Sequence, residues 1–210
     1  MLTAVKRRIS PLQIFEIALG IGLAAALLWG AVSIHRQQEL AGRVVRLHIL
    51  ANSDSEEDQT LKLQVRDRIL SRAEELLTAA KDRSQAQESL KAALPELEAL
   101  AAEEIALRGY DYPVTARLEQ AAFPTREYDG FALPAGEYLA LRVVIGAGEG
   151  HNWWCVVFPP LCTETTTDLA QTAMAAGMTE EDVALICEEE GYVLKFKSIE
   201  LWEALKARFA

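Results

Sequence analysis

The sequence has few of the residues that build metal centres and disulfide frameworks. Its 210 residues include three histidines and three cysteines, and none of them stands at the spacing of a known metal-binding motif. We therefore predict no metal site and no cofactor. Three cysteines cannot all pair within one chain, so one of them must stay outside any internal disulfide.

Positive charge is also scarce. The formal net charge is −10, and residues 1–33 carry three basic side chains against one acidic side chain, so the remainder has a net charge of −12. An acidic body of this kind is repelled by phosphate backbones and by anionic lipid headgroups. The charge excludes a nucleic-acid partner and a polybasic membrane-surface role.

Charged side chains are absent from residues 17–34, which follow a basic cluster at residues 6–8. Eighteen helical residues span about 27 Å, enough to cross the hydrocarbon core of a membrane. Ala31-Val32-Ser33 also offers small residues at the spacing that signal peptidase favours, so the segment is either a membrane anchor or an export signal that is cleaved after Ser33. In both cases the basic cluster stays inside, and the chain after His35 lies outside the cytoplasm.

The rest of the chain has the composition of a folded domain. Half of the sequence is hydrophobic, which is enough to build a core, and we find no internal repeat and no low-complexity segment. We therefore divide the chain into residues 1–38, a signal peptide or membrane anchor, and residues 39–210, an extracytoplasmic domain.

Hydrophobic periodicity predicts an α+β fold, with an antiparallel or mixed sheet packed with helices and preceded by the N-terminal helix. Short apolar and β-branched runs between Gly, Pro and Asp predict strands. Apolar residues at intervals of three or four predict helices, the first of which begins at the capping residue Ser55, and Pro95 predicts a kink or two stacked helices. The predicted strands are residues 44–50, 114–118, 131–133, 138–145, 153–158 and 192–196, and the predicted helices are residues 55–77, 84–109, part of the acidic segment 163–194, and 198–209.

Two tryptophans, Trp153 and Trp154, stand side by side in a predicted strand. Successive side chains of a strand point to opposite faces, so one can enter the core while the other faces a second layer, a partner or solvent. Either both are buried between packed layers, or one is exposed for recognition, because tryptophan is favoured at binding hot spots.

Cys155 and Cys162 lie on the exported side, where thiols can oxidise, and Pro159 and Pro160 between them could turn the chain back on itself. A disulfide between them would close a loop of about eight residues and contribute roughly 2.5 kcal/mol in the chain-entropy model. Cys187 would then be left over. The alternative is that Cys155 and Cys162 are buried and reduced.

A second interpretation of the domain is a cell-envelope enzyme with Cys155 as nucleophile. The residue types of a papain-like site are present, but their spacing matches no motif, and a cysteine within a strand is expected to be buried. We therefore predict that the chain is not an enzyme and keep this interpretation as the alternative. In it, the base would be His48 or His151, and the orienting group would be Asn52 or Asp54.

Several sequence blocks, in a fixed order, cover most of residues 44–162. They are residues 46–59 and 61–67, residues 123–125 with Tyr128, residues 133–138, and residues 152–162. In these blocks the chain resembles the stage II sporulation protein R family. Residues 163–190 carry little of this resemblance.

The resemblance implies a sporulation signal. Proteins of this family are made in the forespore and exported into the space between its membrane and that of the mother cell. There they trigger a membrane-embedded aspartic protease of the mother cell, which removes the pro-sequence of the early mother-cell sigma factor. The implied role is an activating ligand, secreted or anchored at the forespore membrane, and the resemblance assigns no catalytic residues.

We predict that the surface for this protein partner lies on the strand region, at whichever of the two adjacent tryptophans is exposed. The residues predicted to contribute to it are His151, Asn152, Trp153, Trp154, Tyr138 and Arg142.

Overall fold

The computed structural model describes residues 10–128, 130–161 and 168–187. The chain divides into two units, residues 1–37 and residues 38–210. We call the second one the sheet unit, and we describe each unit by itself.

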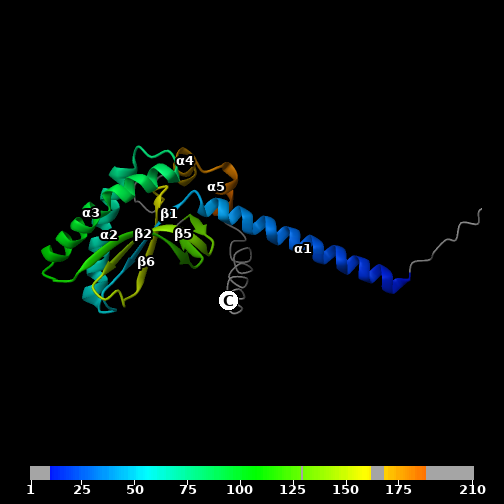
Figure 1. Ribbon diagram of the computed structural model, residues 1–210, viewed down its shortest axis with the longest axis horizontal. Helices are drawn as coiled ribbons and strands as arrows, with labels where there is room; N and C mark the ends of the chain where they lie inside the picture. The colour runs from blue at the N-terminus through cyan, green and yellow to red at the C-terminus, as the bar shows by residue number, and fades with distance from the viewer. Residues whose placement is uncertain (1–9, 129, 162–167, 188–210) are drawn as a thin grey trace, which may run out of the picture. The chain divides into compact units, whose positions relative to one another are not determined.

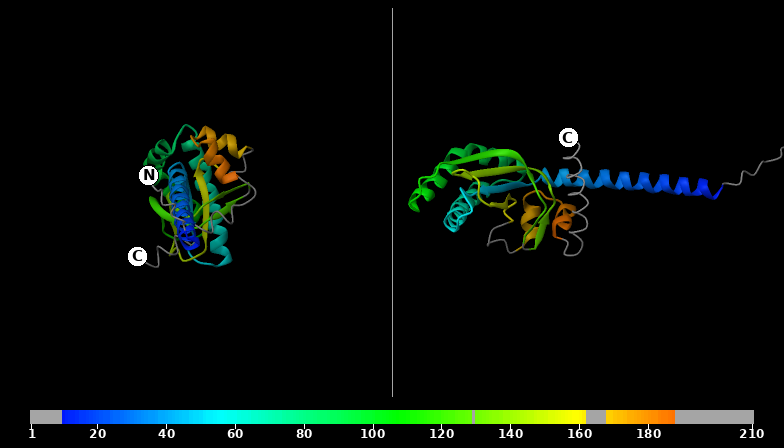
Figure 2. Two further views of the ribbon diagram at one scale, coloured as in Figure 1. Left: turned by 90° about the vertical axis from the view of Figure 1, so that its right-hand side faces the viewer. Right: turned by 90° about the horizontal axis from the view of Figure 1, so that it is seen from below.

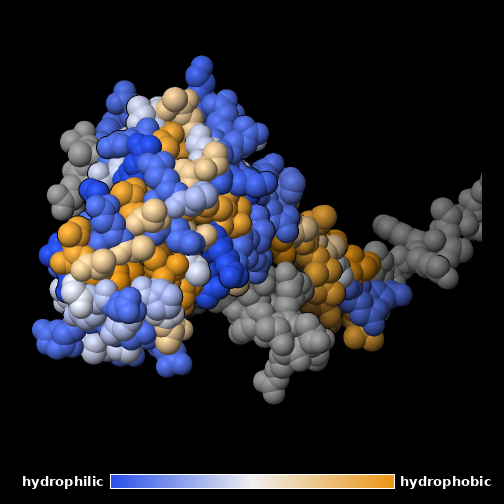
Figure 3. Space-filling view, turned by 60° about the vertical axis from the view of Figure 1, so that its left-hand side comes forward, coloured by the Kyte–Doolittle hydropathy of each residue, from blue (hydrophilic) through white to orange (hydrophobic). Residues whose placement is uncertain are grey.

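The first helix, α1 (Pro11–Ala41), is unbroken (Figure 1). It contains the uncharged residues 17–34 and extends beyond them on both sides. Its most apolar window has a mean hydropathy of 2.2 and is not buried, and the part of α1 visible in Figure 3 is mostly hydrophobic. By length and composition α1 can cross a membrane, and an export signal near an N-terminus has the same properties. An apolar N-terminal helix is therefore present, as predicted, and Ser33 lies within it.

The sheet unit is built on a mixed sheet with the strand order β2-β5-β1-β6. Strand β1 (Val45–Leu50) runs parallel to β5 (Gly136–Ile145) and antiparallel to β6 (Asn152–Phe158). Strand β2 (Val114–Phe123) pairs with β5 in antiparallel orientation. The predicted α+β fold with a mixed sheet is confirmed.

One face of the sheet is covered by α2 (Glu56–Leu77) and α3 (Arg83–Leu107), which also pack against each other (Figure 1). The buried residues of α2 recur every four positions, at Leu61, Val65 and Ile69, because one stripe of an amphipathic helix faces the core. They pack with inward-facing strand side chains in the larger of two hydrophobic cores. This packing fixes which strand residues face the helices and which face away.

The predicted helix start at Ser55 is confirmed. Its side chain accepts a hydrogen bond from the Asp58 backbone N–H at 3.1 Å, which satisfies one of the donors left free at a helix N-terminus. Thr179 and Asp182 cap another helix start reciprocally. The Thr179 N–H donates to Asp182 Oδ2 at 2.8 Å, and the Asp182 N–H donates to Thr179 Oγ1 at 3.2 Å.

Of the two predictions for Pro95, a kink or two stacked helices, the second is wrong, because α3 continues through it as one helix. Proline removes the hydrogen bond to the carbonyl of residue i−4, here Lys91. Both residues are exposed, so water can satisfy that carbonyl. Leu90 and Leu97, on either side of the proline, stay in the core.

The opposite face of the sheet is covered at one end within the described residues. A hairpin of β3 (Arg126–Tyr128) and β4 (Phe131–Leu133) and two short helices, α4 (Leu169–Ala175) and α5 (Glu180–Cys187), bury a second hydrophobic cluster there. Both views of Figure 2 show α4 and α5, in orange, next to each other. Strand β3 was not predicted, and the predicted strand 192–196 and helix 198–209 lie outside the described residues.

Candidate functional site

Two loops meet at one end of the sheet, the loop from β1 to α2 and the loop from β5 to β6. The Gly150 N–H donates to the Ala51 carbonyl at 3.0 Å, and the Glu149 N–H donates to the Asn52 carbonyl at 3.2 Å. A Cβ atom on Gly150 would lie 2.2 Å from the carbonyl oxygen of Ser53. The two backbones therefore approach as closely as they do only because residue 150 is glycine.

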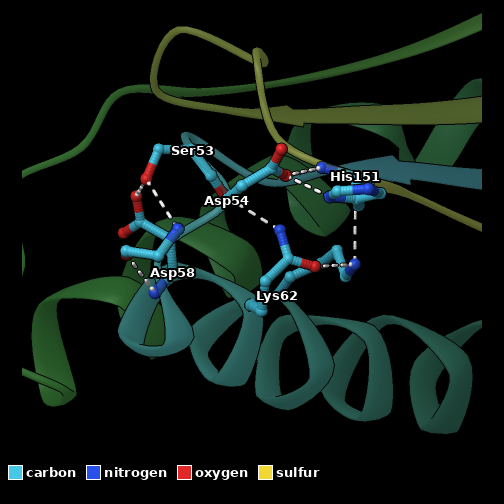
Figure 4. A network of polar contacts seen from close by, with 7 residues as sticks. Ser53, Asp54, Asp58, Lys62 and His151 are labelled. Carbon is cyan, nitrogen blue, oxygen red and sulfur yellow. Dashed lines mark hydrogen bonds and ion pairs between the residues drawn. The ribbon is translucent and has the colours of Figure 1, made fainter.

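A polar network joins these loops to α2 (Figure 4). The His151 N–H donates to Asp54 Oδ1 at 2.6 Å, and the His151 ring Nδ1 also contacts that oxygen. Lys62, on α2, donates to the His151 carbonyl at 3.0 Å and to Gln59 Oε1 at 2.6 Å. The hydrogen bond from the His151 backbone lowers the pKa of Asp54, and burial lowers the pKa of Lys62. The network therefore holds the β5–β6 loop against the β1–α2 loop and the first turns of α2.

Four side chains form one row across the sheet, which we call the cross-strand row. Arg117 of β2 pairs with Arg142 of β5, Arg142 pairs with His48 of β1, and His48 pairs with Trp154 of β6. Their sequence neighbours Leu118, Leu141, Leu47 and Cys155 pack in or against the larger core, and side chains alternate along strands, so the row points away from α2 and α3. It brings residues from all four strands of this sheet onto one surface.

The arginines of the cross-strand row are only partly neutralised. Arg142 Nη1 lies 3.2 Å from Glu119 Oε1, with 38% and 36% of the two side chains exposed. Arg117 is exposed and forms no ion pair with any described residue. Like charges directly opposite each other on neighbouring strands destabilise a sheet. The pairing of Arg117 with Arg142 therefore does not help the sheet to fold.

His48 stands between Arg142 and Trp154 in the row. Its Nε2 lies 2.7 Å from Asn152 Oδ1, and its ring stacks on Trp154 with the centroids 5.7 Å apart. Burial lowers the pKa of His48, with the nearby Arg142 and Arg46 acting in the same direction and the Asn152 hydrogen bond opposing it. His48 is therefore a neutral hydrogen-bonding group at pH 7.

Both predicted tryptophans are half-buried, and they point to opposite faces as predicted. The Arg66 guanidinium lies 4.9 Å from the Trp153 ring, and the Arg126 guanidinium lies 3.8 Å from the Trp154 ring. Cation–π contacts of this kind fix an aromatic ring in place. Neither tryptophan stands free in solvent.

The other predicted contact residues differ in accessibility. His151 and Asn152 are exposed and Arg142 is half-buried. Tyr138 is 1% exposed and its hydroxyl donates to the Pro134 carbonyl at 2.7 Å, so it cannot contact a partner directly. It instead packs beside Arg46, whose guanidinium lies 5.0 Å from the Tyr138 ring.

Arg46 is a buried cation that sequence reasoning missed. It is 0% exposed and lies 4.1 Å from the centre of the Phe123 ring. Its Nη2 donates to the Tyr128 hydroxyl at 2.6 Å, while Nε and Nη1 have no hydrogen-bond partner among the described residues. Burial lowers the pKa of Arg46. Arg117 was missed as well, although the alternation of Thr115, Arg117 and Glu119 with apolar residues was a signal for one polar strand face.

Cys155 is fully buried and disulfide-bonded, and Cys187 is a free thiol. Cys162, the predicted partner of Cys155, lies outside the described residues, so that pairing stays a prediction. A disulfide-bonded sulfur cannot act as a thiolate nucleophile, and His48 points to the opposite face of the sheet. The enzyme interpretation therefore lacks its nucleophile.

The pairing can be tested by counting thiols in the exported protein. We expect one alkylated cysteine in denaturant without reductant and three after reduction, because the pair would be closed and Cys187 is free. Intact mass measures both numbers and also reports whether residues 1–33 have been removed. Two or three alkylated thiols before reduction would show that the pairing is wrong.

The same pairing predicts that Cys155→Ser and Cys162→Ser lower the free energy of unfolding equally, by roughly 2.5 kcal/mol.

Comparison with known proteins shows which family the chain belongs to. Residues 41–168 match the family model described as Stage II sporulation protein R (spore_II_R). The Stage II sporulation protein R of Bacillus subtilis (strain 168) is 41% identical over 123 residues, which are 57% of this chain and 54% of that protein. The chain thus spans about half the length of this curated relative, and no solved structure matches it. Because the family model covers more than half of the residues, the chain belongs to the stage II sporulation protein R family, and its role is in sporulation.

Proposed function

We propose that the chain is an exported signal that activates a membrane-embedded aspartic protease of the mother cell, which then removes the pro-sequence of the early mother-cell sigma factor. The observation that carries this proposal is family membership over residues 41–168, which includes every strand of the sheet. The protein acts as a ligand of the protease and performs no cleavage itself.

The N-terminal unit supports the export step. A signal made in one cell and read in the membrane of its neighbour must leave through a segment such as α1, which has the length and composition for it. The site of action is then outside the cytoplasm, either at the forespore membrane if α1 stays as an anchor or free in the intermembrane space if it is removed.

The sheet unit supports action by binding. In the described part of the chain no group of three or more metal-ligating side chains comes together, and the sulfur of the alternative nucleophile is in a disulfide. By contrast, the exposed end of the sheet collects polar and aromatic side chains from several strands, and aromatic and arginine residues dominate protein-binding hot spots. This surface is the proposed contact with the protease.

The proposal is tested in a spore-forming bacterium that lacks its own member of the family. Expression of the full chain in the forespore should restore removal of the sigma-factor pro-sequence, measured by immunoblot. A chain without residues 1–38 should fail, and an unrelated export signal fused to residues 39–210 should restore processing if diffusion suffices. Processing by the leaderless chain, or no processing by a folded and exported chain, would contradict the proposal.

A further inference from the structure

We propose that the sheet face that carries Arg117, Arg142 and His48 docks an acidic segment of a protein partner. The identity of that partner as the mother-cell protease rests on the proposed function, but the chemistry of the segment rests on the surface alone. No helix or strand of the described chain covers this end of the face, as the exposure of Arg117 shows.

Charge pairing on this face differs from that of several arginines on α2 and at the end of α3. There, Arg68 lies 3.8 Å from Glu103, Arg72 lies 2.7 Å from both Glu75 and Glu96, and Arg108 lies 2.8 Å from Glu104. On the sheet face, one carboxylate, Glu119, stands against two adjacent arginines. A chain with net charge −10 therefore keeps an excess of positive charge at one place.

The groups beneath the surface increase this excess. Arg46 lies on the same face of β1 as His48, two residues away, and no carboxylate pairs with it among the described residues. The Nε atom of Arg142 is also buried, and no described residue hydrogen-bonds to it. Buried cations act through a low dielectric, so their field reaches the surface with little screening. A partner's carboxylate would gain both from this field and from the free donors of Arg117.

The spacing suits a protein segment. Neighbouring strands are about 4.8 Å apart, so Arg117 and His48 are separated by roughly 10 Å, with Arg142 between them. Carboxylates at alternate positions of an extended segment lie about 6.6 Å apart, and those one helical turn apart lie at a similar distance. Two such carboxylates can therefore face the two arginines, and His48 continues the row beside them.

Charge reversal at Arg117 tests the surface in the full chain. Arg117→Glu would place a carboxylate opposite Arg142, which is a favourable cross-strand pair, so the fold should be at least as stable by thermal unfolding. Binding to the purified, detergent-solubilised protease should nevertheless weaken by about tenfold or more. Arg68→Glu is the matched control, because it makes the same charge change on α2 at a side chain that is 51% exposed. Equal affinity of the two variants would overturn the inference while leaving the proposed function intact.

A second arm separates the inference from the proposed function. A labelled hexaglutamate peptide should bind the wild-type chain and the Arg68→Glu control, and should bind Arg117→Glu much more weakly, whereas hexalysine should bind none of them at this face. If the protease itself does not bind the wild-type chain, the proposed function is wrong and the peptide result decides the inference. Failure of hexaglutamate to bind the wild type, or Arg117-dependent binding to vesicles of phosphatidylglycerol and phosphatidylcholine in its place, would overturn it.

Discussion

Asp58→Ala is expected to lower the free energy of unfolding of the sheet unit by about 3 kcal/mol. Asp58 is 4% exposed, and its Oδ2 accepts hydrogen bonds from Asn52 Nδ2 at 2.9 Å and from Ser53 Oγ at 2.6 Å. The substitution leaves these donors without an acceptor and removes a negative charge from the N-terminus of α2. Urea unfolding followed by tryptophan fluorescence measures the loss.

The control for this prediction is Asp67→Ala on the same helix. Asp67 is 64% exposed and pairs with its neighbour Arg66, and exposed pairs of this kind contribute at most about 1 kcal/mol. Equal losses for the two variants would show that the loop hydrogen bonds of Asp58 do not hold the β1–α2 junction.

The effect of Asp58 should also depend on pH. Burial alone would raise the pKa of Asp58, but hydrogen bonds from Ser53 and Asn52 outweigh it and hold the pKa below its ordinary value of 3.8. Because the unfolded state then binds the proton more readily, the stabilisation is complete above the unfolded pKa and is lost as the pH falls through the folded pKa. The difference in stability between wild type and Asp58→Ala should therefore be largest near neutral pH and shrink below about pH 4.

Gly150→Ala is expected to cost about 3 kcal/mol of stability and to disturb the surface next to the cross-strand row. The new Cβ would meet backbone atoms, Ser53 O at 2.2 Å and Ser53 C at 2.6 Å, rather than the end of a flexible side chain. The loops must then separate, which breaks the hydrogen bond from the Gly150 N–H to the Ala51 carbonyl and pulls His151 away from Asp54.

The matched control is Gly136→Ala in β5 of the same unit. There the nearest side-chain atom, Tyr138 Cε2, would lie 3.5 Å from the new Cβ, which is an ordinary contact. The free energy of unfolding of this variant should lie within about 1 kcal/mol of the wild-type value. Comparable urea midpoints for the two alanine variants would contradict the account of the loop contact.

Local patterns in the sequence were sufficient to predict most elements. The four-residue spacing from Leu61 to Ile69 and the cap at Ser55 predicted α2, and the uncharged residues 17–34 predicted α1. These features depend on neighbours in sequence, so periodicity reports them. Strand β3 has three residues, Arg126–Tyr128, which is too short for any period to show.

The cross-strand row could not be predicted in the same way, because it depends on strand register. Arg117, Arg142 and His48 come from three strands, and a shift of one residue in any pairing would turn a side chain to the other face. Arg142 was named as a contact for its place in a strand, but its like-charged neighbour Arg117 and the buried Arg46 became visible only once the strands were aligned. Tyr138, which was predicted as a contact, lies on the same face of β5 as Arg142, but it is buried in the second hydrophobic cluster at the covered end of that face.

Reconstitution shows whether the chain activates the protease from the extracytoplasmic side. The protease is placed in vesicles with the pro-sigma factor enclosed on the cytoplasmic side, and the purified full chain is added either outside or inside. We expect the pro-sequence to be removed only when the folded chain is outside, on the side to which its N-terminal segment would deliver it. Cleavage without the chain, cleavage when the chain is enclosed with the pro-sigma factor, or no cleavage when it is outside would contradict that claim.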